Sequence, residues 1–233
     1  MMYCLLLDSS NKYLSVGLSK DGKVFDSIFY EAWQRQSEVM VSEIENILKR
    51  NNISKSEIEA IVVGIGPGSY TGVRIAITIA KTIAYALKIK VYKVSSLSLL
   101  RIDDAPTICV FNARSGRSYF GVYKGNEVIK EDSVEANEVL LKYISEHKDY
   151  KLSGDLANIG LTSEKFDIIK NLALGVNDKN LVSNIFMLNP TYLKDLTKWL
   201  QFERWVLMIL IEFMSSNLNV LLHLGKRVIW FTK

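Results

Sequence analysis

The chain has 233 residues, of which 48% are hydrophobic and 23% are charged, and its formal net charge is +4. These proportions are typical of a globular protein with a packed core, and they exclude a disordered chain. The small net charge permits contact with nucleic acid, but it falls short of the concentrated basic face expected of a protein that binds nucleic acid by itself.

The first fifty residues predict three antiparallel strands followed by a helix. A continuous apolar run, typical of a strand buried on both faces, ends at Asp8, where turn-forming residues follow. Two alternating segments on either side of Asp21-Gly22 indicate a hairpin. Apolar residues then recur at helical spacing until Asn51. The predicted elements are strands at 3–7, 13–18 and 24–30 and a helix at 37–50.

The next segment predicts a strand, a crossover helix and a second strand. Ser54 and Glu57 form a capping-box pattern just before the strand at 60–63. A glycine-rich loop then leads into a helix at 73–87, and a strand at 91–94 follows. A crossover of this kind joins parallel strands through a right-handed connection.

The second half of the chain repeats this arrangement loosely. It predicts strands at 107–112 and 119–123, a third strand ending near 134, a helix at 137–146 and a short strand from 151. Two successive units of this kind predict a duplicated α/β fold in which mixed sheets are flanked by helices. We expect an N-terminal lobe at 1–100, a smaller C-terminal lobe at 101–196 and an atypical apolar tail at 197–233.

The tail differs in composition from the rest of the chain. Residues 199–231 are dense in Trp, Phe, Leu, Ile and Met. Their longest unbroken apolar stretch, 205–211, is far shorter than the roughly 20 residues of a membrane span, so no membrane role is expected. The tail is either an extra helix packed on the body or a segment foreign to the ancestral protein, and the sequence leaves both open. No leader pattern precedes the first strand, so the expected location is cytoplasmic.

Four glycines between residues 64 and 72 mark the most informative loop. Backbone amides at the start of a helix can hold an anion, which makes the loop a candidate phosphate or nucleotide site. Asp8 could face such a phosphate through Mg²⁺, or it could bond its own turn. The alternative for the loop is a tight, close-packed turn with a helix cap, and the chemistry alone favours this alternative. The candidate residues are Asp8, Gly66, Gly68, Ser69 and Thr71.

The string from Gly66 to Arg74, GPGSYTGVR, resembles the signature of the TsaB (YeaZ) family. That family has the fold shared by actin, Hsp70 and sugar kinases. Further segments resemble the family over roughly residues 1–196. These are Asp8-Ser9-Ser10, 14–18, Ser95-Ser96-Leu97, 112–116 with Tyr119, and 190–193.

The resemblance implies a role in tRNA modification. TsaB proteins pair with a paralogue, TsaD, and act with the ATPase TsaE to place a threonylcarbamoyl group on the adenosine beside the anticodon. TsaD carries the catalytic metal, whereas TsaB is a partner that lacks it. We therefore expect a non-catalytic scaffold subunit that stabilises a TsaD-type transferase and contacts tRNA through the complex. A competing homodimer, and ATP or ADP bound in the assembled complex, are further expectations, while no intrinsic cofactor is expected.

The histidine content supports the absence of catalysis. The resemblance implies that TsaD-type proteins carry two histidines four residues apart, where this chain has Ser96 and Leu100. Its two histidines, His147 and His223, are far apart in sequence, so no histidine-pair metal site is expected. We predict no catalytic and no metal-binding residue. The alternative function is an ATP-dependent small-molecule kinase or ATPase of the same superfamily, and a metallopeptidase lacks its chemical basis here.

Two helices are the candidate partner interface. The segments at 37–50 and 73–87 would be neighbours in the N-terminal lobe and would present residues outside their core-facing stripes. Some of these apolar residues could instead fill the core of the chain itself. Tyr85 is the first candidate for a buried anchor. The predicted interface residues are Val39, Met40, Val41, Thr78, Thr82 and Tyr85.

Overall fold

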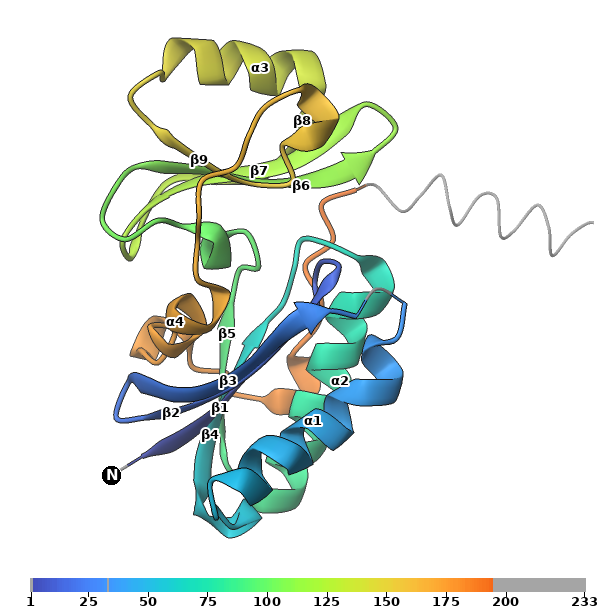
Figure 1. Ribbon diagram of the computed structural model, residues 1–233, viewed down its shortest axis with the longest axis vertical. Helices are drawn as coiled ribbons and strands as arrows, with labels where there is room; N and C mark the ends of the chain where they lie inside the picture. Colours follow the sequence, from blue (N-terminus) through green and yellow to red (C-terminus); the bar gives the residue numbers. More distant parts are fainter. Residues whose placement is uncertain (1, 33, 195–233) are drawn as a thin grey trace, which may run out of the picture. The chain divides into compact units, whose positions relative to one another are not determined.

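The computed structural model describes residues 2–32 and 34–194, which contain two mixed sheets flanked by helices (Figure 1). This confirms the expected α/β fold class of mixed sheets flanked by helices. The described residues up to Leu193 belong to one compact unit. The predicted tail at 197–233 lies outside the described residues.

The first sheet has the strand order β3-β2-β1-β4-β5. Its first three strands are antiparallel, whereas β1 pairs with β4, and β4 with β5, in parallel. The parallel pairing of β4 and β5 confirms the crossover predicted from the sequence. The strands are β1 (Tyr3–Asp8), β2 (Tyr13–Lys20), β3 (Lys23–Glu31), β4 (Ile58–Gly64) and β5 (Lys90–Val94).

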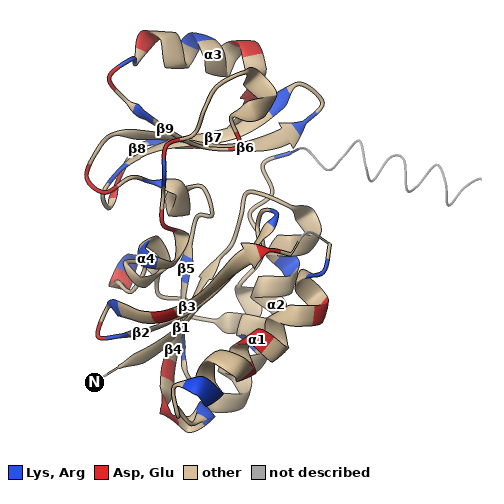
Figure 2. Cartoon of the chain, viewed as in Figure 1, with Lys and Arg blue, Asp and Glu red and all other residues tan. Residues whose placement is uncertain are grey.

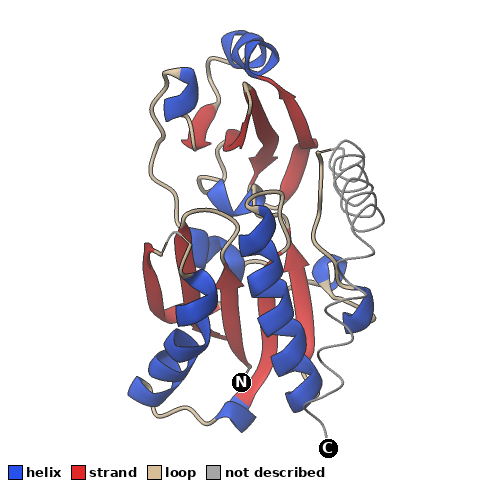
Figure 3. Ribbon diagram, turned by 90° about the vertical axis from the view of Figure 1, so that its right-hand side faces the viewer, coloured by secondary structure: helices blue, strands red, loops and turns tan. Residues whose placement is uncertain are grey.

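Helices cover both faces of the first sheet. Helices α1 (Gln36–Arg50) and α2 (Tyr70–Leu87) lie side by side over one face (Figure 3), and α4 (Ile168–Ala173) packs against the other. The alternation along β1 separates two apolar layers. Leu5 and Leu7 pack with α1 and α2, whereas Cys4 and Leu6 pack with α4. We call this sheet with its helices the first lobe.

The second sheet, which with helix α3 (Asn137–Glu146) forms the second lobe, has the order β8-β7-β6-β9. Leu140 of α3 packs against Phe120 and Val122 on one face of the sheet. Cys109 is on the opposite face, and both cysteines of the chain are buried and free. The strands are β6 (Thr107–Arg114), β7 (Arg117–Lys124), β8 (Glu127–Ala136) and β9 (Lys151–Gly154).

Two features differ from the sequence prediction. Helix α2 begins at Tyr70, three residues before the predicted start, because Ser69 is its N-cap. The chain after residue 167 returns to the first lobe, where it forms α4 and then lines β5 and α2. Packing therefore assigns 168–193 to the first lobe and not to the expected lobe at 101–196. Short 3-10 turns lie at Lys55–Glu57, Ser98–Leu100, Ala157–Ile159, Asp178–Asn180 and Ile185–Met187.

Among the described residues, none of the helices has the length and apolar character needed to cross a bilayer.

Candidate functional site

The glycine-rich loop packs directly on the turn that follows β1. The Ser69 amide donates to the Ser10 carbonyl at 2.6 Å, and the Ser9 hydroxyl donates to the Gly72 carbonyl at 2.8 Å. The Gly72 amide donates to the Ser69 hydroxyl at 3.2 Å, which caps α2. Amides and carbonyls of the loop are thus committed to protein partners.

The glycines allow this close approach. A Cβ atom at Gly68 would lie 2.3 Å from the Ser10 carbonyl oxygen, and one at Gly72 would lie 1.9 Å from that of Ser9. A Cβ at Gly64 would lie 2.0 Å from Asp8 Oδ2. Each distance is far below van der Waals contact, so only glycine fits. The geometry supports the tight-turn interpretation of the loop.

Asp8 is a fully buried carboxyl group with partners on both oxygens. Its Oδ1 accepts from the Ser10 amide at 3.1 Å and from the Ser10 hydroxyl at 2.8 Å. Its Oδ2 accepts from the Ser96 hydroxyl at 3.1 Å, and Ser96 Oγ in turn accepts from the Gly66 amide at 2.9 Å. Burial raises the pKa of Asp8 from 3.8 to about 6. Asp8 therefore links β1 to the loops after β4 and β5.

The structure brings four of the five candidate loop residues together. Asp8, Gly66, Gly68 and Ser69 lie in this network, whereas Thr71 is exposed on the first turn of α2. The position four residues after Ser96 is Leu100, which is fully buried in the apolar core. Within 2–32 and 34–194, no group of three or more His, Cys, Asp or Glu side chains could hold a metal ion.

His147 lies at the C-terminal end of α3. Its Nδ1 is 2.8 Å from the Tyr143 carbonyl oxygen, and its ring stacks on that of Tyr143 with the centroids 4.1 Å apart. The ring therefore packs locally against its own helix.

Four of the six predicted interface residues are exposed on the outer faces of α1 and α2. Val41 is 56% exposed and Tyr85 is 66% exposed. Thr78 and Thr82 are also exposed, and Val39 is half-buried against the core. These assignments remain predictions, because the structure contains no partner.

The prediction for Met40 was wrong. Its side chain is completely buried, because it lies on the same helical stripe as Ile44 and Ile47, which faces the sheet.

An open groove of about 460 Å³ lies between α1 and α2. Val41 and Thr78 contribute to it from opposite sides. Tyr70, at its rim, is half exposed and stacks on Tyr192 with the ring centroids 5.1 Å apart. The lining residues are Ser37, Val41, Tyr70, Thr71, Arg74, Ile75, Thr78 and Ile79.

The segment at 185–192 adds residues that the sequence did not predict for this surface. Lys81 on α2 donates to the carbonyls of Phe186 and Leu188, each at 3.2 Å. Phe186 and Met187 remain 67% and 72% exposed, and the Phe186 ring contacts Tyr85 edge-on at 5.8 Å. The sequence signal was the pair of adjacent apolar residues Phe186 and Met187. No local pattern could place this pair beside α2.

Comparison with known proteins gives the family. The family model described as "TsaD: tRNA N6-adenosine threonylcarbamoyltransferase" matches residues 30–195. A curated relative, "tRNA threonylcarbamoyladenosine biosynthesis protein TsaB" of Escherichia coli, is 30% identical over 68% of this chain and 71% of its own length. The chain belongs to the TsaB (YeaZ) family. The TsaB protein of Bacillus subtilis is 33% identical, over 60% of this chain and 63% of its own length.

Solved structures agree with the TsaB fold. "YeaZ from Pseudomonas aeruginosa" superposes with a TM-score of 0.70 at 23% identity, covering 83% of this chain and all of that one. A second structure, of a protein "with similarity to peptidase YEAZ" from the same organism, gives a TM-score of 0.73 at 24% identity.

Proposed function

We propose that this chain is a non-catalytic partner subunit of the machinery that makes threonylcarbamoyladenosine in tRNA. The names of its TsaB relatives support this pathway. In the proposal, the chain docks a TsaD-type paralogue through α1 and α2 and stabilises its active conformation, which is a population shift. A TsaE-type ATPase, tRNA, and ATP or ADP in the assembled complex belong to the same proposal, as does a homodimer that competes for the surface.

The exposed apolar surface of α1 and α2 carries the docking proposal. Val41, Tyr70 and Tyr85 are each more than half exposed, and they lie on two helices whose other faces already cover the sheet. Aromatic residues that are exposed in the free subunit and buried on binding supply much of the affinity of protein interfaces. Tyr85 is well placed for this role because Phe186 supports its ring.

The chemistry of the polar network supports the non-catalytic part of the proposal. Asp8 has no exposed surface, and its oxygens accept hydrogen bonds from Ser10 and Ser96. Any Mg²⁺ or phosphate approaching this carboxylate would have to displace these donors. Such an arrangement suits a residue that fixes loops better than one that binds a nucleotide, as the alternative kinase or ATPase function requires.

A matched pair of valines tests the docking surface. Val41 on α1 and Val139 on α3 are 56% and 51% exposed, so Val41→Glu and Val139→Glu place equal charges on two helical surfaces. Affinity for the TsaD-type protein of the same organism would be measured by size-exclusion chromatography and titration. We expect Val41→Glu and Tyr85→Ala to weaken binding by roughly tenfold or more, and Val139→Glu to leave it unchanged.

The full chain should be compared with a shortened chain ending at Leu196. A stable complex, together with no threonylcarbamoyl transfer by this chain alone, would support the proposal. Binding by the shortened chain only would identify the tail as an obstruction. If neither form binds, the partner role fails, and ATP turnover by the isolated protein becomes the test of the alternative.

A further inference from the structure

The hairpin that joins β6 to β7 has a tightly defined backbone at its tip. Arg114, Ser115 and Gly116 have φ angles of 61°, 53° and 68°, so three consecutive residues are left-handed. Ser115 and Gly116 form the two-residue turn, in which both central residues ordinarily have positive φ. Arg114 lies beside the turn, where the register between β6 and β7 shifts.

Specific hydrogen bonds hold the tip in this shape. The Arg114 amide donates to Asn112 Oδ1 at 2.8 Å. The Gly116 carbonyl accepts from the Asn137 amide at 2.9 Å, which ties the tip to the start of α3. The Ser118 hydroxyl also donates to Asn137 Oδ1, at 2.9 Å. The tip is therefore a fixed platform.

This platform presents two exposed arginines, Arg114 and Arg117. Figure 2 shows basic positions, in blue, at the hairpin end of the second sheet. Arg117 donates one hydrogen bond to the Val134 carbonyl at 3.1 Å. Within the part of the chain that the structure describes, neither guanidinium has a carboxylate within 4.0 Å. This holds although Glu135 of β8 and Glu138 of α3 belong to the elements that flank the tip.

The other described arginines have partners. Arg35 and Arg50 pair with carboxylates, at 3.5 Å and 2.5 Å. Arg74 donates to the Tyr70 hydroxyl at 2.7 Å, and Arg101 is buried with its guanidinium on backbone carbonyls. The hairpin tip thus differs in placing two exposed guanidinium groups close together on one rigid support, neither of them paired with a carboxylate.

We propose that Arg114 and Arg117 bind phosphate groups of the tRNA backbone, an assignment that rests on the proposed function in tRNA modification. The planar fork of a guanidinium matches two phosphate oxygens, and such contacts position a nucleic acid without reading its sequence. Two fixed contacts of this kind also suit a chain with a net charge of only +4, which cannot supply a broad basic surface.

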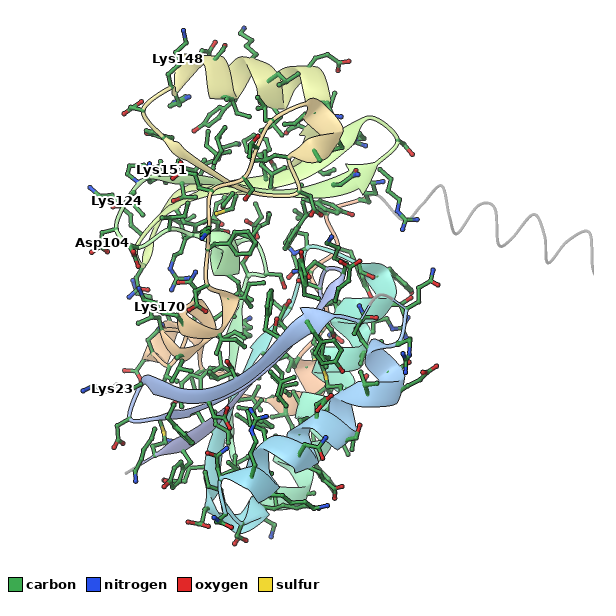
Figure 4. All side chains as sticks on the ribbon, in the orientation of Figure 1. Lys23, Asp104, Lys124, Lys148, Lys151 and Lys170 are labelled. Atoms are coloured by element: carbon green, nitrogen blue, oxygen red, sulfur yellow. The ribbon has the colours of Figure 1, made fainter. Side chains whose placement is uncertain are left out.

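The same hairpin offers a matched control. Lys124 is at the opposite end of β7 from Arg117, roughly 23 Å away at the rise of an extended strand. Lys124 and Lys148 point outward along one edge of the molecule (Figure 4). Neither lysine has an ion pair among the described residues. The lysine pair variant, Lys124→Gln with Lys148→Gln, therefore removes two positive charges. The arginine pair variant, Arg114→Gln with Arg117→Gln, removes the same number.

Filter binding of an unmodified tRNA transcript would test the proposal. The transcript would be titrated with the isolated full chain and, separately, with its complex with the TsaD-type protein. Each titration would be repeated over a series of KCl concentrations. We expect the arginine pair variant to raise the Kd roughly tenfold and to reduce the slope of log K against log salt by about 1.4 to 1.8. The lysine pair variant should change the Kd less than twofold. Arg114→Lys with Arg117→Lys should recover part of the affinity, because charge is kept and the fork is lost.

Complex formation and thermal unfolding are measured for the same variants. Unchanged tRNA binding by the arginine pair variant would overturn the proposal, as would equal losses in the arginine and lysine variants. Loss of TsaD-type binding with tRNA affinity intact would overturn it too, and would assign the tip to a carboxylate on a partner protein. If the unsubstituted chain forms no complex, the proposed function fails. The arginine proposal then stands only if the isolated chain binds the transcript and the arginine pair variant binds it more weakly, and it is overturned if the isolated chain does not bind.

Discussion

Asp8 is the residue on which three segments of the first lobe converge. Because burial raises its pKa from 3.8 to about 6, the native state keeps the proton up to about pH 6, whereas the unfolded chain releases it near pH 4. The contribution of this group to stability is therefore complete below pH 4 and falls as the pH rises to 6, by about 2 to 3 kcal/mol.

We expect Asp8→Asn to remove this part of the pH dependence, since an amide does not titrate. The measurement is urea denaturation between pH 4 and pH 7.5. The exposed Asp149→Asn should keep the slope of the unsubstituted chain. An Asp8→Asn variant that also kept this slope would show that Asp8 ionises normally in the native state.

Gly72 tests whether close packing explains the glycine-rich loop. Alanine is normally the better helix former by about 1 kcal/mol, so Gly72→Ala within α2 would ordinarily stabilise. Here the added Cβ meets the Ser9 carbonyl oxygen at 1.9 Å, and we expect destabilisation by about 1 to 3 kcal/mol. Thermal or urea unfolding gives the sign, with the exposed neighbour Thr71→Ala as control. A stabilised Gly72→Ala variant would contradict the packing interpretation.

The sequence could not decide between the two interpretations of this loop. Residue types and spacing placed Gly68 and Gly72 at a strand-to-helix junction, but both an anion site and a tight turn use glycine there. The deciding contact is with Ser9 and Ser10, about sixty residues earlier in the chain. A local sequence pattern carries no information about a contact between residues so far apart in the chain. Met40 failed for a different reason. Its spacing with Ile44 and Ile47 already placed it on the buried stripe of α1, and its assignment to the interface went against that pattern.

Most elements were predictable because their periodicity reflects burial. The strands of both sheets and helices α1, α2 and α3 lie where alternation or helical spacing placed them. Helix α4 was missed because six residues are fewer than two helical turns, too short for a periodic pattern. Its position comes from tertiary contacts instead. Asn171 is buried and donates to the carbonyls of Leu99 and Arg101, each at 2.8 Å.

We expect Asn171→Ala to destabilise the protein by about 2 to 3 kcal/mol, because two buried carbonyls would lose their donor. Lys170→Ala, on the same helix, removes only an exposed ion pair with Asp103 and should change stability by less than about 0.5 kcal/mol. Chemical denaturation of both variants is the measurement. Equal effects would show that Asn171 does not hold α4 in place.

The two lobes share an apolar layer and a polar contact within the compact unit at 1–193. Residues of β1, β4 and β5 pack in one cluster with residues of β6, β7 and α4. Beside it, the Ser95 hydroxyl after β5 donates to Asp132 Oδ2 at 2.6 Å, and the Tyr123 hydroxyl donates to Asp132 Oδ1. A Cβ at Gly121 would lie 2.5 Å from Asp132 Oδ1, so glycine is needed there. No local sequence pattern indicates this link, because its members lie on three separate elements.

This network predicts how the lobes unfold. Burial raises the pKa of Asp132, so its carboxylate depends on donors from Ser95 and Tyr123. Tyr123→Phe removes one donor and leaves the ring in the core, and we expect a loss of about 1 to 2 kcal/mol. The lost hydrogen bond lies within the second lobe, and Ser95 joins Asp132 to the first lobe. We therefore expect faster amide exchange in β7, in β8 and in the residues that follow β5. Exchange that quickened equally in β1 and β2 would instead mean that the whole unit unfolds as one.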